Sequence, residues 1–328
     1  TVDMAEMVIL PVPWEVTVTY REGTINGPEA ILKASTQVDL FQEDIIDAWK
    51  MGITMLPIND LLKSQGVQQR SIANAYDQWL EAGEPETVRN LYEKSPERIN
   101  AACEKMNDWV YQHAKLYIEQ GKIIGLLGGD HSTPLGLIRA MAEKHSSFGI
   151  LQIDAHADLR PAYKGLDYSH ASIAHNFIKI PEVKHLVQVG VRDFCEQEWA
   201  YIQSEKRISL YTDDQLKEEQ YQGVNWSEIC KRIIADLPEK VYLTIDIDGL
   251  LPHLCPNTGT PVPGGLDYQQ LMFLIKMLVK SGRQIIGFDL VEVAPGESGD
   301  EWDAIVGARI LYRVANLVGL SQGKLSWC

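Results

Sequence analysis

The sequence predicts an α/β protein built around a parallel β-sheet. Short apolar runs recur along the 328 residues, and most of them are continuous rather than alternating in polarity. Continuous apolar runs are typical of strands buried on both faces, as in parallel sheets. Amphipathic helical patterns separate most of these runs, and this alternation of strand and helix indicates right-handed crossover connections.

Eight apolar runs are the candidate strands, at residues 8–13, 53–58, 122–128, 148–153, 185–191, 208–211, 241–248 and 284–293. Three intervening segments have apolar residues at spacings of three and four, which predicts amphipathic helices. These segments are residues 99–117, 226–237 and 268–280. Asn225 is a suitable N-cap for the second helix, and Gly282 marks the end of the third.

We find no internal repeat and no convincing domain boundary, so we predict a single domain over residues 1–328. Residues 64–97 are the most polar and charge-rich stretch of the chain. We expect them to form short helices on the solvated surface. A contact between subunits of an oligomer is the less favoured alternative.

Composition and charge argue against several classes of protein. The formal net charge is −15, whereas nonspecific nucleic-acid binding requires a basic surface. This charge is compatible with cationic substrates, although solubility alone also explains it. No apolar run approaches the ~20 residues of a membrane helix. The first basic residue is Arg21, so no signal-peptide n-region is visible.

The five cysteines are scattered along the chain and include no CxxC pair. They predict neither a disulfide framework nor a thiolate zinc site. A reducing cytoplasm is therefore the expected compartment.

Four polar motifs follow predicted strands, at the ends where α/β sheets bind ligands. The first is Gly128-Gly129-Asp130-His131-Ser132, whose glycines allow a tight turn that presents His131. The second is Asp154-Ala-His156-Ala-Asp158, whose three polar side chains point the same way on an extended backbone. Such groups are costly at the end of a buried strand unless they bind a cation, which favours metal ligation.

The other two motifs supply further carboxylates. Asp246 and Asp248 project to one side at the end of the run 241–248, and two like charges so close repel each other unless a cation lies between them. Glu292 lies near the end of the last run. Its residue type alone allows either an ion pair or a functional role.

The motifs together supply four aspartates and two histidines for metal binding, which are too many ligands for one tetrahedral zinc. They include no thiolate and fit two hard or borderline divalent cations, with Mn²⁺ as the natural choice. Two ions about 3.5–4 Å apart can share carboxylates and lower the pKa of bound water, so that hydroxide is available near neutral pH. The candidate ligands are His131, Asp154, His156, Asp158, Asp246 and Asp248.

In these motifs and their order, the chain resembles the ureohydrolase (arginase/agmatinase) family. The matching segments are residues 128–132, 154–158 and 246–248, followed by the Thr258-Gly-Thr-Pro261 stretch. The resemblance begins at Tyr20-Arg21-Glu22-Gly23 and continues past Glu292, and only the stretch around residues 64–97 has no counterpart that we can place. It implies a three-layer α/β/α fold, two Mn²⁺ ions per chain and a homo-oligomer, either a trimer or a hexamer.

The resemblance also implies how the ligands divide between the two ions. By this match His131 and Asp158 bind one ion, His156 and Asp248 bind the other, and Asp154 and Asp246 bridge them. Thr244 stands where the family usually has Ser, which keeps the hydroxyl, and Leu251 stands where an Asp is common.

Three residues make up the catalytic set that the resemblance implies. Glu292 matches the carboxylate that binds the substrate guanidinium, with which a carboxylate forms a planar, potentially bidentate pair. His170, in Tyr168-Ser169-His170-Ala171-Ser172, matches the proton-shuttling histidine of the family. An imidazole, with a pKa of about 6.5, suits the protonation of a leaving amine. We also assign Asp158, a candidate metal ligand, to the catalytic set.

The expected reaction is hydrolysis of a small cationic guanidino substrate to urea and an amine. Residues 159–170 do not match arginase and look like agmatinases of the archaeal type, so the first candidate is agmatine, a reaction of polyamine biosynthesis that yields putrescine. Arg160 lies where it favours a carboxylate tail, as in 4-guanidinobutyrate or formiminoglutamate, unless it turns away and pairs with a carboxylate such as Asp167. Aminopropylagmatine and arginine are further candidates.

Two other classes of protein are less favoured alternatives. Arginase-fold deacetylases use one zinc and a neighbouring His-His pair, but this sequence has no His-His dipeptide. An inactive scaffold with the same fold is expected to lose some ligands, and all six are present here.

Overall fold

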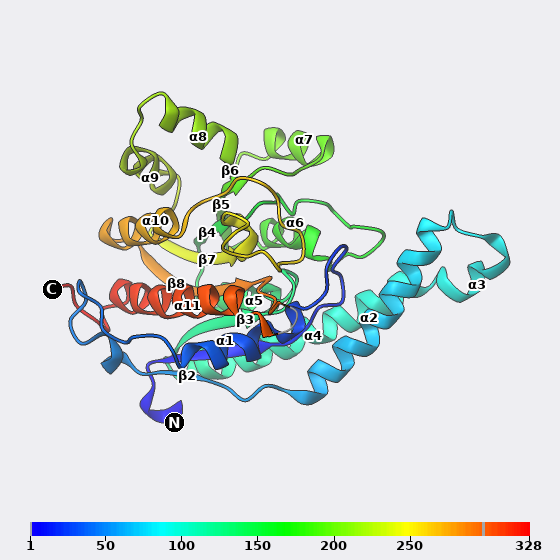
Figure 1. The fold of residues 1–328 in the computed structure, drawn as a ribbon, viewed down its shortest axis with the longest axis horizontal. Helices are drawn as coiled ribbons and strands as arrows, with labels where there is room; N and C mark the ends of the chain where they lie inside the picture. The colour runs from blue at the N-terminus through cyan, green and yellow to red at the C-terminus, as the bar shows by residue number, and fades with distance from the viewer. Residues whose placement is uncertain (1, 297–298) are drawn as a thin grey trace.

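The computed structural model describes residues 2–296 and 299–328 and places eight strands in one sheet (Figure 1). The strands are β1 (Met7–Val12), β2 (Ile53–Met55), β3 (Ile123–Gly128), β4 (Phe148–Ile153), β5 (Val183–Val191), β6 (Ile208–Thr212), β7 (Lys240–Asp246) and β8 (Gln284–Val291). The α-helices are α1 (Gly27–Ser35), α2 (Asp60–Glu81), α3 (Arg89–Tyr92), α4 (Ser95–Glu119), α5 (Leu135–Lys144), α6 (Ile173–Ile178), α7 (Glu196–Ser204), α8 (Asp213–Tyr221), α9 (Trp226–Ala235), α10 (Tyr268–Lys280) and α11 (Trp302–Ser321).

The strands are all parallel, in the order β2-β1-β3-β8-β7-β4-β5-β6. The eight predicted strands and the parallel sheet are confirmed, with shifts of a few residues at their ends. β7 ends at Asp246 rather than at residue 248, because the Asp246 side chain accepts a hydrogen bond from the backbone N–H of Asp248 and starts a 3-10 turn. The edge strand β2 stops at Met55, shortly before Pro57, which cannot donate a ladder hydrogen bond.

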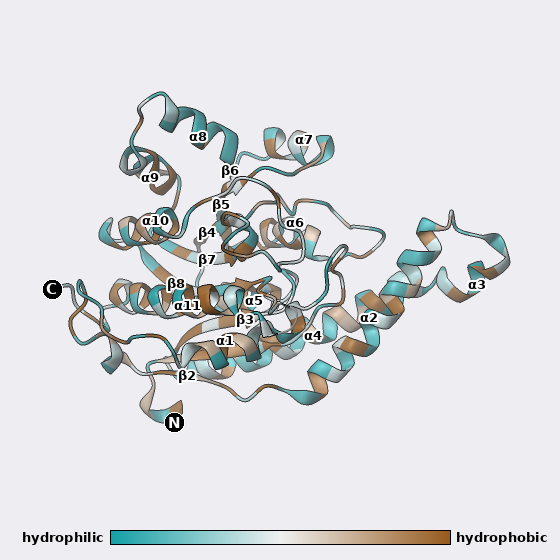
Figure 2. Cartoon of the chain, viewed as in Figure 1, coloured by the Kyte–Doolittle hydropathy of each residue, from teal (hydrophilic) through white to brown (hydrophobic). Residues whose placement is uncertain are grey.

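Two apolar cores, one on each face of the sheet, confirm the α/β/α layering. One core contains side chains of α1, α8, α9, α10 and α11, such as Ile31 and Ile310. The other contains side chains of α2, α4, α5, α6 and α7, such as Leu137 and Phe177. In Figure 2, α8 is largely hydrophilic, whereas α2 carries both apolar and polar residues along its length.

The predicted helix ends follow from local hydrogen bonds. The Asn225 side chain accepts a hydrogen bond from the Glu228 backbone N–H at the start of α9, as an N-cap does. A capping box between Asp267 and Gln270 starts α10, and Gly282 takes a left-handed φ of 85° just after this helix ends.

Helix α11 is the one helix in the described residues that is long and apolar enough to cross a membrane by length and composition. The sequence analysis had found no run of that kind, because Asp303, Arg309 and Arg313 interrupt the apolar residues. Of the most apolar stretch of α11, 61% is buried within the fold. This helix packs against α1, α10 and β8.

Residues 60–119 form an arm in which α2 and α4 pack against each other (Figure 1). Helix α4 also contacts α5, β1 and β3, and the outer end of the arm, which carries α3, extends away from the sheet. The expectation of short helices across residues 64–97 holds for α3, which has four residues, but not for α2, which has 22. Asn59 caps α2 by accepting a hydrogen bond from the Leu62 backbone N–H. Large aromatic side chains, including Tyr76 and Trp79, are buried along α2 despite its polar composition.

Candidate active site

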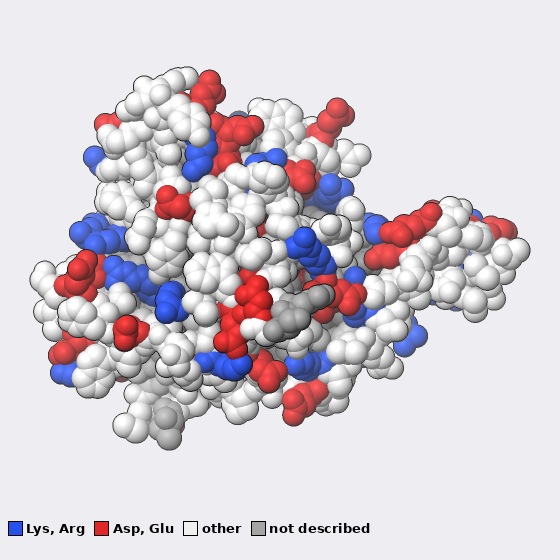
Figure 3. Space-filling model, viewed as in Figure 1, with Lys and Arg blue, Asp and Glu red and all other residues white. Residues whose placement is uncertain are grey.

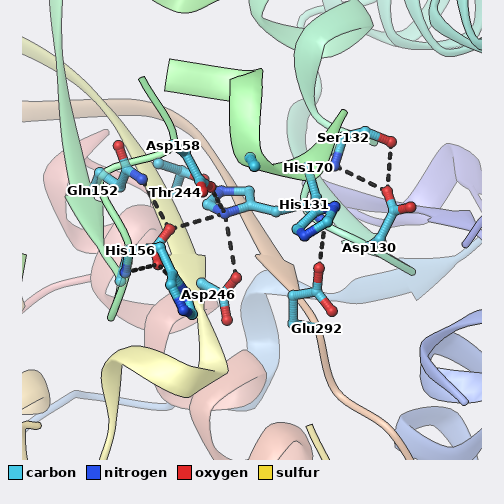
Figure 4. Close-up of polar contacts among 12 residues, drawn as sticks. Asp130, His131, Ser132, Gln152, His156, Asp158, His170, Thr244, Asp246 and Glu292 are labelled. Carbon is cyan, nitrogen blue, oxygen red and sulfur yellow. Dashed lines mark hydrogen bonds and ion pairs between the residues drawn. The ribbon is translucent and has the colours of Figure 1, made fainter. Parts of the chain in front are cut away.

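The predicted site residues lie at the carboxyl ends of four neighbouring strands. His131 follows β3, Glu292 follows β8, Asp246 ends β7, and Asp154 follows β4. These strands are consecutive in the sheet order, so residues far apart in the sequence meet at its centre. Figure 4 shows how the side chains of His131, Asp246 and Glu292 converge.

The turn after β3 is shaped by close backbone packing. A Cβ atom on Gly129 would lie 1.9 Å from the carbonyl oxygen of Trp14, so only glycine fits there. The buried Asp130 side chain accepts hydrogen bonds from the backbone and hydroxyl groups of Thr17 and Ser132. These contacts present the next residue, His131, toward the other strand ends.

The His131 imidazole lies among three carboxylates. Its Nδ1 atom is 3.0 Å from Asp154 Oδ2, 3.2 Å from Asp158 Oδ2 and 3.3 Å from Asp246 Oδ2. Its Nε2 atom is 2.9 Å from the hydroxyl of Thr244, which donates to the buried Asp289. The hydroxyl at position 244 therefore orients the ring.

His156 forms a second group with Asp154 and Asp248. Its Nδ1 atom lies 3.1 Å from Asp248 Oδ2 and 3.6 Å from Asp154 Oδ1. Candidate ligand atoms of these three residues lie within 4.8 Å of one another, as do those of His131, Asp154 and Asp246. Asp154 belongs to both groups, whereas Asp246 belongs to the first.

Burial and mutual repulsion raise the pKa values of these carboxyl groups, and the neighbouring imidazoles lower them. Burial and the neighbouring Asp154 raise the pKa of Asp158 to about 7. Burial, Asp248 and Asp154 raise the pKa of Asp246 well above its usual range. Burial also acts to raise the pKa of Asp154, but His131 and His156 overcome that effect and lower it below the usual range.

The donor set fits divalent cations. Asp154, Asp158, Asp246 and Asp248 are at most 5% exposed, and aspartates so deeply buried require compensating positive charge. Carboxylate oxygens and imidazole nitrogens are ligands that Mn²⁺ accepts. Neighbouring polar groups hold the carboxylates in place, since Gln152 Nε2 donates to Asp154 at 2.8 Å and the Ala155 backbone N–H donates to Asp248 at 3.1 Å.

Glu292 is fixed by its backbone and by one carboxylate oxygen. Its φ of 61° is left-handed, and its backbone bonds to the Gly129 carbonyl and to the hydroxyl of Thr258. Its Oε1 atom accepts a hydrogen bond from the His131 backbone N–H at 2.8 Å. Among the described residues, its buried Oε2 atom has no hydrogen-bond partner. Burial and the nearby Asp130 raise the pKa of this carboxyl well above its usual range.

His170 is held by Thr17, a residue that the sequence analysis missed. The His170 backbone N–H donates to Thr17 Oγ1 at 3.0 Å, and its Nδ1 atom lies 3.4 Å from the same oxygen. Thr17 in turn donates to Asp130. Burial lowers the pKa of His170 to about 4, so its ring is neutral near pH 7.

A cavity of about 170 Å³ opens beside the cluster and is lined by His156, Asp158, His170, Arg160, Tyr163, Thr19, Asp193, Phe194, Glu198, Ala171 and Thr260. Arg160 is not turned away from this cavity, and its partner is Glu198 rather than Asp167. Its Nε atom lies 3.6 Å from Glu198 Oε2, and its guanidinium lies over the Tyr163 ring, 4.8 Å from the centroid.

Residues 5–316 match the Arginase family. The chain belongs to the arginase family. It is 30% identical to N(1)-aminopropylagmatine ureohydrolase of Thermus thermophilus, over 98% of this chain and 93% of the other. It is 29% identical to agmatinase of Chromobacterium violaceum, over 93% and 81% of the two chains. As a member of this family, the chain is a hydrolase of the amidinohydrolase class that acts on guanidino compounds.

Solved structures of this family share the fold. The agmatine ureohydrolase of Thermoplasma volcanium matches with a TM-score of 0.72 at 21% identity, covering 99% of this chain and 93% of the other. The arginase of Bacillus subtilis matches with a TM-score of 0.66 at 20% identity, covering 94% and 97%. The expected arginase-like α/β fold is therefore confirmed.

Sequence reasoning missed the residues that support the site. Thr17 lies in an irregular loop with no periodic pattern, so nothing marked its contact with His170. Glu198 lies on α7, away from every motif. Asp289 was detectable, because it is a carboxylate inside an otherwise apolar strand.

Proposed function

We propose that this arginase-family enzyme hydrolyses a cationic guanidinoalkylamine, with agmatine as the first candidate and putrescine and urea as the products. The observation that carries this proposal is the position of Glu292. Its buried Oε2 atom, which has no hydrogen-bond partner within residues 2–296 and 299–328, lies beside the His131–Asp154–Asp246 group. A carboxylate placed in this way suits a guanidinium, which offers paired N–H donors in one plane.

We propose that the cluster binds two Mn²⁺ ions. His131 and Asp158 would hold one ion, His156 and Asp248 the other, and Asp154 and Asp246 would lie between them. The close approach of His131 Nδ1 to three carboxylates and the place of Asp154 in both groups support this division. When bound, such ions supply a nucleophile at neutral pH by lowering the pKa of water.

The protein's own residues orient the substrate and move protons. Glu292 fixes the guanidinium plane, which brings its carbon toward the cluster in a reactive geometry. His170 lines the cavity and is neutral near pH 7, so it can take up a proton and deliver it to the departing amine. Asp158 also lines this cavity, which supports a contact with the reacting group.

The cavity lining favours a cationic tail. Arg160 is already paired with Glu198 and stacked on Tyr163, which reduces its attraction for a substrate carboxylate. Asp193 adds a further negative charge to the lining. This balance supports agmatine over arginine, 4-guanidinobutyrate or formiminoglutamate.

N1-aminopropylagmatine is the second candidate. Relatives of that name from Thermus thermophilus and Synechocystis are 30% and 29% identical and match 98% of this chain. The additional amine of N1-aminopropylagmatine is cationic, so this compound also suits a cavity lining with more carboxylates than cations.

The test is urea release with Mn²⁺ supplied, comparing agmatine, N1-aminopropylagmatine, arginine and 4-guanidinobutyrate by kcat/KM. A preference for either of the first two supports the proposal, and a preference for a carboxylate-bearing substrate contradicts it. Metal analysis of the same preparation tests the binuclear site. About two Mn per chain supports it, whereas one zinc favours the deacetylase alternative and no metal favours an inactive scaffold.

A further inference from the structure

The arm contacts two loops that border the substrate cavity. The first is the N-terminal loop (residues 13–26), which carries Thr17 and the cavity-lining Thr19. The second is the 159–169 loop, which carries Arg160 and Tyr163 and leads to His170. These contacts are made between Arg70 and Asp77 of α2 and at Asn100 of α4, whereas α3 lies at the outer end of the arm, away from the rest of the chain (Figure 1).

Helix α2 of the arm bonds to the N-terminal loop through Arg70 and Asn74. Arg70 Nη1 donates to the Val16 carbonyl at 3.2 Å, and its Nε atom donates to Glu22 at 3.0 Å. Asn74 donates to the same Glu22 oxygen at 2.9 Å. Val16 directly precedes Thr17, which contacts both Asp130 and His170, so this contact lies one residue from the site.

The 159–169 loop contains a tight turn from Tyr163 to Leu166. The backbone groups of these two residues bond to each other in both directions, at 2.9 and 3.2 Å. The central residues Lys164 and Gly165 have φ values of 52° and 79°, which are left-handed. Lysine is strained in this conformation, so the turn depends on contacts from elsewhere in the fold.

Two residues of α2 contact Lys164 at the centre of this turn. The Tyr76 hydroxyl donates to the Lys164 carbonyl at 3.2 Å. Asp77 forms an ion pair with the Lys164 ammonium at 2.8 Å. Tyr76 is 8% exposed and packs beside Trp79, which holds its hydroxyl in position.

One residue of α4 contacts the centre of the turn and the residue that follows it. Asn100 Nδ2 donates to the Gly165 carbonyl and to Asp167 Oδ2, both at 3.1 Å. Asn100 Oδ1 accepts from the Asp167 backbone N–H at 2.9 Å. The two helices of the arm therefore fix this turn from two directions.

The turn determines where the cavity lining lies. Tyr163 begins the turn, and the Arg160 guanidinium stacks on its ring while also pairing with Glu198. A shift of the turn would move Tyr163 and change how much positive charge Arg160 presents to the cavity. It would leave the strands that carry the carboxylate cluster in place.

We propose that the arm positions the entrance of the substrate cavity. In this arrangement Asn100 and Tyr76 are positioning residues that determine how tightly the enzyme binds the part of the substrate beyond its guanidino group. The proposal rests on the proposed function, because it assigns that part of a guanidinoalkylamine to the cavity beside the cluster.

The experiment compares full-length Mn²⁺-loaded enzyme with the Asn100→Ala and Tyr76→Phe variants. We expect KM for agmatine to rise about fivefold or more in each, while kcat changes by less than about twofold, because the reacting groups are unmoved. Asn90→Ala is the matched control, since it makes the same change in α3 at the outer end of the arm. Its KM should equal that of the unaltered enzyme.

A second readout does not depend on activity. Trypsin cleaves after Lys164, and we expect fragments ending at Lys164 to appear about fivefold faster or more in Asn100→Ala and Tyr76→Phe, measured by mass spectrometry. Asn90→Ala should be cleaved there at the normal rate. Thermal unfolding identifies a variant that does not fold, and Tyr76→Phe, which keeps its ring packing, then decides the test.

The outcomes separate this proposal from the proposed function. Normal KM values in both variants, or raised KM values without faster cleavage at Lys164, would overturn the proposal. An equal effect of Asn90→Ala would also overturn it. If the unaltered enzyme releases no urea from any guanidino compound, the proposed function fails, while the cleavage rates still show whether the arm holds the turn.

Discussion

The Oε1 atom of Glu292 accepts a hydrogen bond from the backbone N–H of His131 at 2.8 Å. This bond joins the residue after β8 to the turn after β3, and it leaves the second oxygen, Oε2, without a hydrogen-bond partner in the described part of the chain. One oxygen of Glu292 therefore has a structural partner, and the other is available to a ligand. This division of roles makes it possible to change the charge of the residue without losing its position.

Glu292→Gln is expected to weaken guanidinium binding without loss of metal. The amide oxygen still accepts the His131 backbone N–H, but the negative charge is removed. Hydrogen bonds to charged groups contribute about 1.5–3 kcal/mol, so kcat/KM should fall roughly 10- to 100-fold. Steady-state kinetics and metal analysis of the same sample check this. If the metal content falls instead, Glu292 belongs to the metal site and its assignment is wrong.

Asp154→Ala should abolish turnover, because Asp154 belongs to both groups of candidate ligands. We expect urea release to fall by more than the roughly 10- to 100-fold that follows loss of a residue supporting a metal ligand, and bound metal to fall well below that of the unaltered enzyme. Asp236→Ala is the control, since Asp236 precedes β7, whereas the site lies at the carboxyl end of that strand, and its side chain accepts a hydrogen bond from Tyr211 of the edge strand β6. Near-normal activity of Asp154→Ala with saturating Mn²⁺ would refute its place at the metal site.

His170→Asn should lower kcat by about 10²- to 10⁴-fold, the range of general acid–base catalysis, and change KM little. Asparagine can keep the backbone contact with Thr17 but cannot carry a proton. His145→Asn, at the end of α5 and before β4 begins, is the matched control and should retain activity. A variant with kcat within about threefold of normal would show that another group protonates the amine.

Phe288→Ala should destabilise the fold by about 3–5 kcal/mol. Phe288 is fully buried in the central strand β8, beside Gly125 of β3, where an added Cβ atom would lie 2.5 Å from the phenylalanine ring. Urea unfolding with an unchanged m-value measures the loss. Phe273→Ala, at a position 38% exposed on α10, is expected to cost less than about 1 kcal/mol. Equal losses would show that β8 is less tightly packed than the structure indicates.

The ion pairs of Asp44 predict a stability difference that depends on pH. Arg313 and Lys276 lower the pKa of Asp44 far below its usual value of 3.8, against the opposing effect of burial. Because this pKa is lower in the folded state than in the unfolded state, the ion pairs of Asp44 stabilise the folded protein fully above pH 3.8. Their contribution to the free energy of unfolding decreases as the pH falls below that value.

Melting temperatures of the unaltered protein and Asp44→Asn at several pH values check this. Their difference should be largest near neutral pH and shrink below about pH 4. Asp47→Asn, which disrupts an exposed pair with Lys50, serves as the control and should give a small difference throughout. A difference for Asp44→Asn that grows as the pH falls would contradict the sign of the effect.

The sequence was sufficient to predict the strands and the site motifs because both are local patterns. The motif 154–158 follows an apolar run directly, and the parallel-sheet rule places such residues at one edge. The order of the strands is not a local pattern. The neighbours of β8 are β3 and β7, and no short segment of the sequence reports that pairing.

The contacts around the substrate cavity could not be predicted for the same reason. The sequence suggested Asp167 as a partner of Arg160 because it is near in the chain, but Glu198 on α7 is nearer in space. Asp167 bonds to Asn100 of the arm instead. Residues 64–97 of the arm were interpreted as short surface helices, because the buried residues of α2 are widely spaced among polar ones.

The place of β8 in the sheet has a consequence for the order of events during translation. The ribosome makes β3 and β7 well before it reaches Gln284. The strand that lies between them in the sheet, β8, emerges only afterwards. The nascent polypeptide thus carries two unconnected half-sheets, with His131 on one and His156 and Asp246 on the other. A product truncated before β8 would retain every candidate metal ligand and still be unable to bring them together.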